Sequence, residues 1–199
     1  MLVRRFGPGD FTERPWKNGR GTTVELQVEP PGATLETGFL WRLSMAAVPA
    51  SGPFSPFPGI DRTLLLLAGN GMELDHGPHG RALLAGPFQP VSFSGDWPTR
   101  GRLLDGPCRD FNVMTRRDAM RHRVDILRPG PVPAPLRPAA TVLVFCAQGR
   151  ASLGPEPLAE GELLRLDGGG GGAARALGGP AVLVVVSLEA CGPGTGAST

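Results

Sequence analysis

The segments TLLLLAGNGMEL (63–74) and TVLVFCAQGRASL (141–153) share one pattern. Each begins with a threonine, continues through a run of apolar residues into a turn that ends in glycine, and then enters a second short segment. Apolar runs of this length that are bounded by glycine turns are typical of short β-strands. Because Gly71 of the first segment corresponds to Gly149 of the second, we interpret the chain as two copies of one β-unit.

The similarity continues downstream of both segments. Asp96 in QPVSFSGD (89–96) aligns with Asp167 in GELLRLDG (161–168), and Phe111 in DFNVMT (110–115) aligns with Val182 in AVLVVVS (181–187). The number of residues that separates equivalent positions of the two copies decreases once, around HGPHGRA (76–82), and then stays constant. A single length change of this kind is expected in a surface loop.

Strand signals dominate the chain and helical periodicity is scarce. One short basic segment, 116–123, fits either a helix or a strand and turn. The strands that we expect are 22–28, 40–48, 63–68, 71–75, 91–93, 111–115, 141–146, 151–153, 163–166 and 181–188. Their order resembles the cupin jelly roll, so we predict an all-β fold of two cupin-like (jelly-roll) β-barrel modules packed as a bicupin.

The domain organisation follows from the repeat and from one proline-rich segment. RPGPVPAPLRP (128–138) is expected to be a stiff, extended linker. We therefore predict an N-terminal module with a pocket at 1–127, a shorter C-terminal module at 139–191, and a disordered tail at 192–199.

Composition argues against several classes of partner. The net charge is only +2, Lys17 is the sole lysine, and the arginines are scattered, so no nucleic-acid-binding surface is expected. The longest apolar runs are too short to span a bilayer, and the start does not resemble a signal peptide. Three widely spaced cysteines favour a reducing compartment. We expect a cytoplasmic protein without membrane or nucleic-acid partners.

Four segments together resemble the HutD/Ves family of bicupin proteins over about residues 1–190. They are PWKNGRGTTVEL (15–26), FLWRLSMAAVPASGPFSPFPGIDRTLLLLAGNGMEL (39–74), FSGDWP (93–98) and LLDGPCRDFNVMTRR (103–117). The family pattern tends to read WKNGGG, and Arg20 replaces its middle glycine here. The resemblance implies two cupin modules with a pocket in the first, and a regulatory or ligand-binding role in histidine utilisation for some members. It implies no catalytic mechanism.

Metal binding is not expected from the three histidines. His76 and His79 are separated by Gly and Pro in the length-variable loop, where we expect solvated side chains, and His122 is expected on an exposed face. A transition-metal site needs three or four well-placed donors. We therefore predict no metal and no cofactor.

A cluster of polar side chains is expected inside the first module. Alternation places Arg42 and Ser44 on one face of a strand that is otherwise apolar. Arg42 needs a buried partner, for which Glu25, Asp61 and Asp110 are candidates, and it is either a structural ion pair or the anchor of a ligand carboxylate. Arg62 is interpreted as structural. The segment PWKNGRGTTVE (15–25) is expected to line the mouth of the module. The predicted ligand-binding residues are Trp16, Lys17, Asn18, Glu25, Arg42, Ser44, Asp61 and Asn112.

These residues favour a metal-free bicupin that binds a small polar metabolite, most naturally a carboxylate. Two alternatives stay open. One is a metal-independent isomerase or lyase that uses Lys17 or Glu25 as a general base. The other is an interaction module that forms a homodimer through its second, more apolar repeat.

Overall fold

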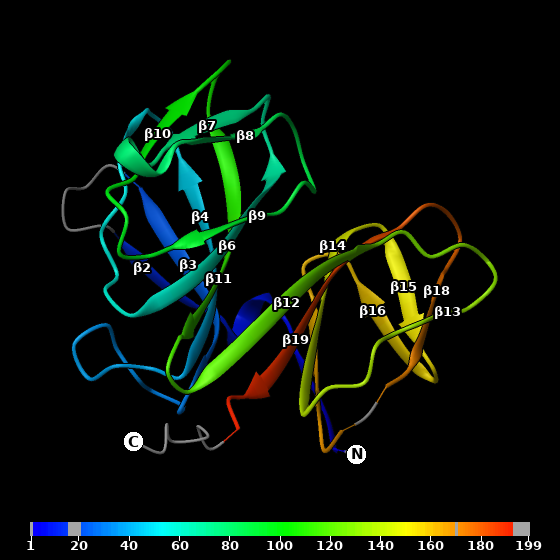
Figure 1. Ribbon diagram of the computed structural model, residues 1–199. Helices are drawn as coiled ribbons and strands as arrows, with labels where there is room; N and C mark the ends of the chain where they lie inside the picture. The colour runs from blue at the N-terminus through cyan, green and yellow to red at the C-terminus, as the bar shows by residue number, and fades with distance from the viewer. Residues whose placement is uncertain (1, 16–20, 170, 193–199) are drawn as a thin grey trace.

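The computed structural model describes residues 2–15, 21–169 and 171–192, and the regular structure of these residues is almost entirely β-strand. Their only helical segments are two 3-10 turns, η1 (Pro8–Asp10) and η2 (Gly77–His79). None of the described helical segments is long and apolar enough to cross a membrane. The strands form four sheets, two in each of two modules that lie side by side in Figure 1. The predicted all-β fold of two jelly-roll modules is confirmed. Residues 193–199 of the expected tail lie outside the described residues.

The first module places a large sheet, in the order β2-β3-β4-β11-β6-β9, against a small sheet, in the order β5-β10-β7-β8. The strands of the large sheet are β2 (Thr12–Pro15), β3 (Thr22–Glu29), β4 (Trp41–Val48), β6 (Ile60–Ala68), β9 (Val91–Ser94) and β11 (Cys108–Arg116). Those of the small sheet are β5 (Gly52–Pro53), β7 (Met72–Asp75), β8 (Arg81–Leu84) and β10 (Arg100–Leu103).

The second module repeats this plan. Its large sheet has the order β1-β17-β14-β19-β12 and its small sheet the order β13-β18-β15-β16. The strands are β1 (Leu2–Phe6), β12 (Met120–Leu127), β13 (Ala134–Pro135), β14 (Thr141–Gln148), β15 (Arg150–Leu153), β16 (Glu156–Ala159), β17 (Leu163–Asp167), β18 (Ala173–Ala176) and β19 (Val182–Ala190). Because β6 and β7 occupy the places of β14 and β15, the internal repeat predicted from the sequence is present in the structure.

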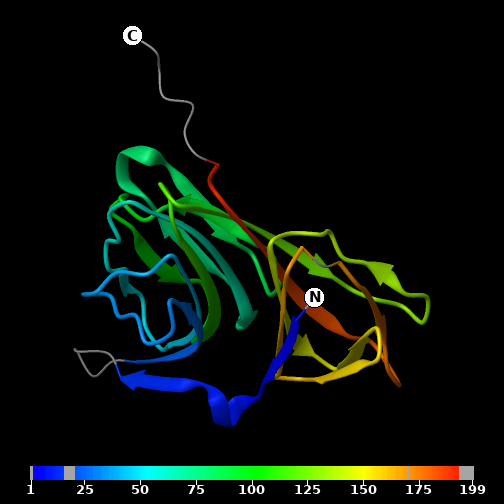
Figure 2. The same ribbon diagram turned by 90° about the horizontal axis from the view of Figure 1, so that it is seen from below.

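Strand pairing crosses the predicted division of the chain. β1 and β12 belong to residues 1–127, but they pair with β17 and β19 in the second module. Figure 2 shows the N-terminal segment running from the second module to the first. The segment 116–123, for which helix and strand were both open, is the end of β11, a turn and the start of β12. The module boundaries at 127 and 139 stay a prediction.

The two large sheets face each other across an apolar core. Strand alternation turns Trp41 and Leu43 of β4, together with Phe111 of β11, away from the first module's interior and toward the second module. The ring centroids of Phe111 and Phe145 are 5.3 Å apart. Burying aromatic side chains of this size stabilises the contact between the modules by roughly 2 kcal/mol each.

The interiors of the two modules differ in chemistry. The buried cluster inside the second module consists of Leu, Val, Ala and one Cys. Inside the first module, apolar clusters around Leu64 and around Met114 accompany a set of buried polar and charged side chains. Burying such groups costs free energy unless they are paired, and buried charged groups often mark functional sites. The first module is therefore where a site is expected.

Candidate functional site

Four neighbouring strands of the large sheet turn polar side chains into the first module. On β6, Arg62 lies on the same face as Leu64 and Leu66, which pack in the interior, whereas Leu65 packs against the second module. The same alternation turns polar side chains of β4, β11 and β3 into the interior. The inward polar residues of this sheet are Glu25, Arg42, Ser44, Arg62, Asp110 and Asn112, and each is at most 9% exposed.

Strand register brings these side chains together. Met114 of β11 lies opposite both Arg42 of β4 and Arg62 of β6. In the next inward-facing row, Ser44 lies opposite both Asn112 and Glu25. The structure therefore gathers four of the eight predicted site residues, Glu25, Arg42, Ser44 and Asn112, in one interior.

Arg42 is paired within the protein. Its Nε donates to Oε2 of Glu25 at 2.6 Å, and both side chains are buried. Glu25 was one of its three predicted partners. A more exposed arginine, Arg14 of β2, approaches the other carboxylate oxygen of Glu25 at 3.8 Å. The charge of Arg42 is thus offset by a carboxylate of the same module.

Arg62, which the sequence analysis interpreted as structural, lies in the same interior. It is 3% exposed, and its Nε has no hydrogen-bond partner among the described residues. Its guanidinium carbon lies 5.5, 5.1 and 4.9 Å from the ring centroids of Phe54, Phe57 and Phe93. Burial lowers the pKa of Arg62 to about 10, partly opposed by the charge of Asp110. The guanidinium is held by aromatic rings, and one of its donors is free.

Asp110 lies deep in the same interior, and no described side chain donates a hydrogen bond to it. Its Oδ1 accepts a hydrogen bond from the backbone N–H of Ala46 at 3.1 Å. Burial raises the pKa of Asp110 to about 7, with the charge of Arg62 and the Ala46 hydrogen bond acting in the opposite direction. Near neutral pH a fraction of Asp110 is therefore protonated and gives Arg62 no counter-charge.

The small sheet adds His76, and here the sequence prediction of a solvated loop is wrong. Met72, Leu74 and His76 alternate along β7 and its end, and all three are buried. The His76 ring lies 4.8 Å from the ring of Phe93, and its Nδ1 is 2.9 Å from Oγ1 of Thr99. The surface loop therefore begins after His76, one residue later than the length difference between the two repeats suggested.

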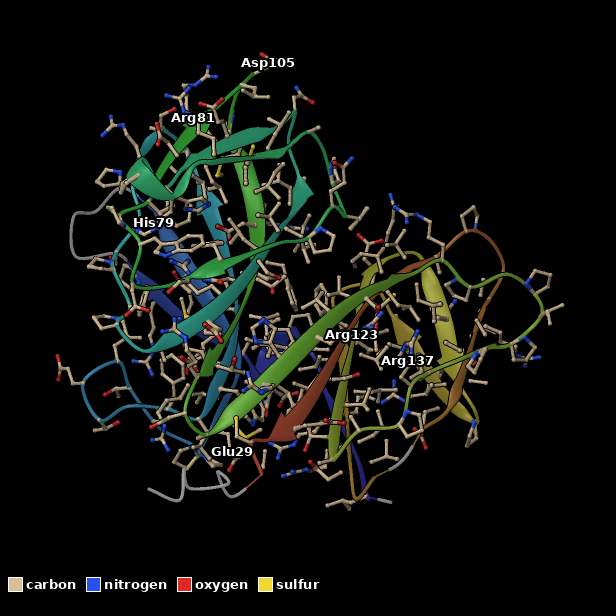
Figure 3. The ribbon with its side chains drawn as sticks, in the orientation of Figure 1. Glu29, His79, Arg81, Asp105, Arg123 and Arg137 are labelled. Atoms are coloured by element: carbon tan, nitrogen blue, oxygen red, sulfur yellow. The ribbon has the colours of Figure 1, made fainter. Side chains whose placement is uncertain are left out.

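His79, in contrast, is exposed as predicted. It lies on the outer side of the first module (Figure 3) and stacks on Trp97 with ring centroids 4.7 Å apart.

His122 is also not on an exposed face. Its Nε2 lies 2.8 Å from Oγ1 of Thr63 in the first module, and its Nδ1 lies 2.7 Å from Oγ1 of Thr115. Burial lowers the pKa of His122 to about 4, although the charge of Asp61 opposes this shift. β12 lies against the first module and thereby encloses the His122 ring. The arginine-rich residues next to His122 in the sequence had suggested an exposed position.

The remaining predicted site residues lie elsewhere. Asp61 occupies the opposite face of β6 from Arg62, is partly exposed, and accepts a hydrogen bond from Nε of Arg117 at 2.6 Å. Trp16, Lys17 and Asn18 lie outside the described residues.

A surface pocket of about 730 Å³ adjoins the interior. Its walls include Leu35, Phe39, Phe57, Ile60, Arg116 and Arg117. Phe57 both lines this pocket and contacts the guanidinium of Arg62. Phe57 is therefore shared by the pocket wall and by the surroundings of the buried arginine.

The interior residues do not fit a transition-metal site. His76 is the one imidazole among the described interior residues, and two guanidinium groups share the space. No three His, Cys, Asp or Glu side chains in the described part of the chain lie close enough to hold a metal ion. The donor set suits an organic anion better than a cation.

Comparisons with known proteins agree with this architecture. The HutD family model matches residues 9–184. A conserved protein of unknown function from Pseudomonas aeruginosa is 34% identical, with a TM-score of 0.83 over 95% of this chain and 100% of that one. HutD from Pseudomonas fluorescens SBW25, in a formate condition, is 30% identical, with a TM-score of 0.82 over 96% and 100%.

A curated relative gives a shorter match. An uncharacterised 21.2 kDa protein in the hutC 3′ region of Pseudomonas putida is 41% identical over 116 residues, which is 58% of this chain. The match spans 59% of that relative's length. YhhW from Escherichia coli, at 7% identity and a TM-score of 0.66, shares the fold alone.

Proposed function

Because the chain belongs to the HutD family, we propose that its first module binds a small carboxylate-bearing metabolite and thereby serves histidine utilisation in a regulatory or accessory role. The link to histidine utilisation is supported by the HutD relative and by the relative in the hutC 3′ region. The two alternative functions, a metal-independent enzyme and a homodimeric interaction module, stay predictions.

The observation that carries this proposal is the free donor of Arg62. A buried guanidinium with an unpartnered N–H is unfavourable unless something else accepts the hydrogen bond. Carboxylates are the preferred acceptors for arginine, since the charge-assisted hydrogen bond gains strength in a water-poor interior. The three phenylalanine rings around Arg62 provide such surroundings.

The charge balance of the interior also favours an anion. Glu25 offsets Arg42, and among the described residues only Asp110 opposes the charge of Arg62. Since burial raises the pKa of Asp110 to about 7, the interior carries a net positive charge whenever this carboxyl is protonated. An anionic ligand on Arg62 then completes the balance.

The surface pocket is the route that we propose for the ligand. Its apolar walls suit a carbon skeleton, and the charges of Arg116 and Arg117 in its lining are offset by Asp118 and by Asp61 and Asp96, respectively. A carboxylate that enters here meets the Phe57 ring next, and displacement of that ring exposes Arg62.

A binding screen tests the proposal. We expect formate, acetate, urocanate or N-formyl-L-glutamate to raise the melting temperature of the wild-type protein, because a ligand at 100-fold its dissociation constant adds about 2.7 kcal/mol. Arg62→Met keeps most of the side-chain volume but removes the donor, so it should abolish the effect. Arg109→Met, at an exposed position of β11, is the matched control and should retain it.

Two outcomes would contradict the proposal. One is that none of these acids binds the wild-type protein in calorimetric titrations. The other is that Arg62→Met, while folded, binds them as tightly as Arg109→Met does.

A further inference from the structure

The buried ring of His76 has a defined hydrogen-bond arrangement. The hydroxyl of Thr99 donates to the backbone carbonyl of Trp97 at 3.2 Å, so its oxygen is left to accept. The His76 Nδ1 lies 2.9 Å from this oxygen. Both hydrogen bonds can form together only if His76 carries its proton on Nδ1 and donates it to Thr99.

The other ring nitrogen, Nε2, is then a bare acceptor. His76 is 3% exposed, and Nε2 has no hydrogen-bond partner among the described residues. Burial lowers the pKa of His76, against the raising effect of Asp75, so the ring stays neutral near pH 7. Contacts with Phe93 and Trp97 fix the ring plane. The bare nitrogen therefore keeps one direction.

His76 and Arg62 share one aromatic neighbour. Phe93 lies 4.8 Å from the His76 ring and 4.9 Å from the Arg62 guanidinium carbon. They belong to the two facing sheets of the module: Arg62 lies on β6 of the large sheet, two residues before the buried Leu64, and His76 follows β7 of the small sheet, two residues after the buried Leu74. A free donor and a free acceptor thus lie in the same part of the interior.

From this pair we infer that the ligand carries a hydrogen-bond donor, an N–H or O–H group, in addition to its carboxylate, and that His76 selects for that donor through Nε2. The inference rests on the proposed binding function and adds a substrate class to it. Simple carboxylates satisfy Arg62 alone, whereas N-acyl amino acids, hydroxy acids and imidazole acids satisfy both groups.

Asn112 is less selective than His76. Its Oδ1 also lacks a partner among the described residues, but an amide can rotate and offer its N–H₂ group instead. The imidazole can exchange roles only if the Thr99 hydroxyl turns to donate to Nδ1 and so gives up its hydrogen bond to the carbonyl of Trp97. His76 is therefore the residue that imposes a donor on the ligand.

The first test needs no ligand. Long-range ¹⁵N–¹H spectra of the histidine rings, assigned with His76→Phe, should show the His76 proton on Nδ1 near pH 7. In Thr99→Val, which keeps the side-chain shape, the two tautomers should mix. A proton on Nε2 in the wild-type protein would overturn the inference and leave the role of Arg62 untouched.

The second test uses two acids that differ in one donor. N-acetylglycine has an N–H group where N-acetylsarcosine has an N-methyl group. We expect the wild-type protein to bind the first about tenfold more tightly, the effect of one hydrogen bond in a buried site. His76→Phe should bind both equally, since its ring fills the space but accepts no hydrogen bond.

The outcomes separate the two proposals. If the preference persists in His76→Phe, a steric clash with the methyl group explains it and the inference fails. If acetate binds in an Arg62-dependent manner but the N–H acid has no advantage, the inference fails alone. If no acid binds in an Arg62-dependent manner, the proposed function fails.

Discussion

Arg62 and Phe57 lie against each other, with the guanidinium carbon 5.1 Å from the ring centroid, and the same ring forms a wall of the surface pocket. Phe57 is only partly buried. It is therefore a cation–π partner of the buried charge, and in the proposed ligand route it is the barrier between that charge and the pocket.

Replacing Phe57 by alanine should open this barrier. We expect the association rate constant of acetate to rise by about tenfold, because binding no longer waits for the ring to move. Phe54→Ala is the matched control: Phe54 lies 5.5 Å from the same guanidinium but does not line the pocket, so its association rate should stay near wild type. NMR lineshape titrations measure both rates, and equal changes would contradict the proposed route.

Asp110 should make the folded protein less stable as the pH rises. Its pKa is about 7 in the folded state, against an ordinary value of 3.8, so the folded state binds more protons between these values. The penalty begins near pH 4 and reaches on the order of 4 kcal/mol above pH 7. Asp110→Asn, which resembles the protonated form, should lack it. Urea unfolding from pH 4 to 8 measures this, and parallel pH profiles for the two proteins would rule the penalty out.

His122 should make the folded protein less stable as the pH falls. Its pKa falls to about 4 from an ordinary value of 6.5, so the unfolded state binds more protons in that window. Stability is lost as the pH falls from 6.5 to 4, by on the order of 3 kcal/mol. His122→Gln should remove this loss, and the same urea series measures it. An unchanged acid limb in the variant would show that His122 is not buried as a neutral ring.

Arg165 connects the two modules. It stacks on Trp41 at 5.0 Å and pairs with Glu29 at 2.9 Å, and Figure 3 marks Glu29 at the lower end of the first module. Arg165→Met should lower the free energy of unfolding by about 2–3 kcal/mol, since Glu29 loses its arginine, Asp167 loses one of its two arginines, and Trp41 loses a cation–π partner. Arg123→Met, whose partner Asp125 lies on its own strand, should change stability little. Equal losses would show that the contact between the modules does not depend on Arg165.

Local alternation explains what the sequence predicted well. Arg42 and Ser44 lie two positions apart on β4, and Asp110 and Asn112 lie two apart on β11, so the face of each pair follows from the strand assignment alone. The ten predicted strands are all present in the structure. Short edge strands such as β8 and β16 were missed, because pairing with a neighbour defines them more than their own residues do.

The errors concern relationships that sequence alone does not contain. Asp61 was grouped with the site, but successive residues of a strand point in opposite directions, so it faces away from the interior that Arg62 enters. His76 continues the alternation of Met72 and Leu74, which is the signal that could have found it. The enclosure of His122 depends on β12 packing against the first module, and no local pattern reports that packing.

The most direct test of the central claim observes the Arg62 N–H itself. In ¹⁵N–¹H spectra of the arginine side chains, assigned with Arg62→Met, the Nε–H signal of Arg62 should move progressively as acetate is added, and Arg109 should stay unchanged. An Arg62 signal that does not move while acetate saturates the protein would contradict carboxylate binding at this arginine.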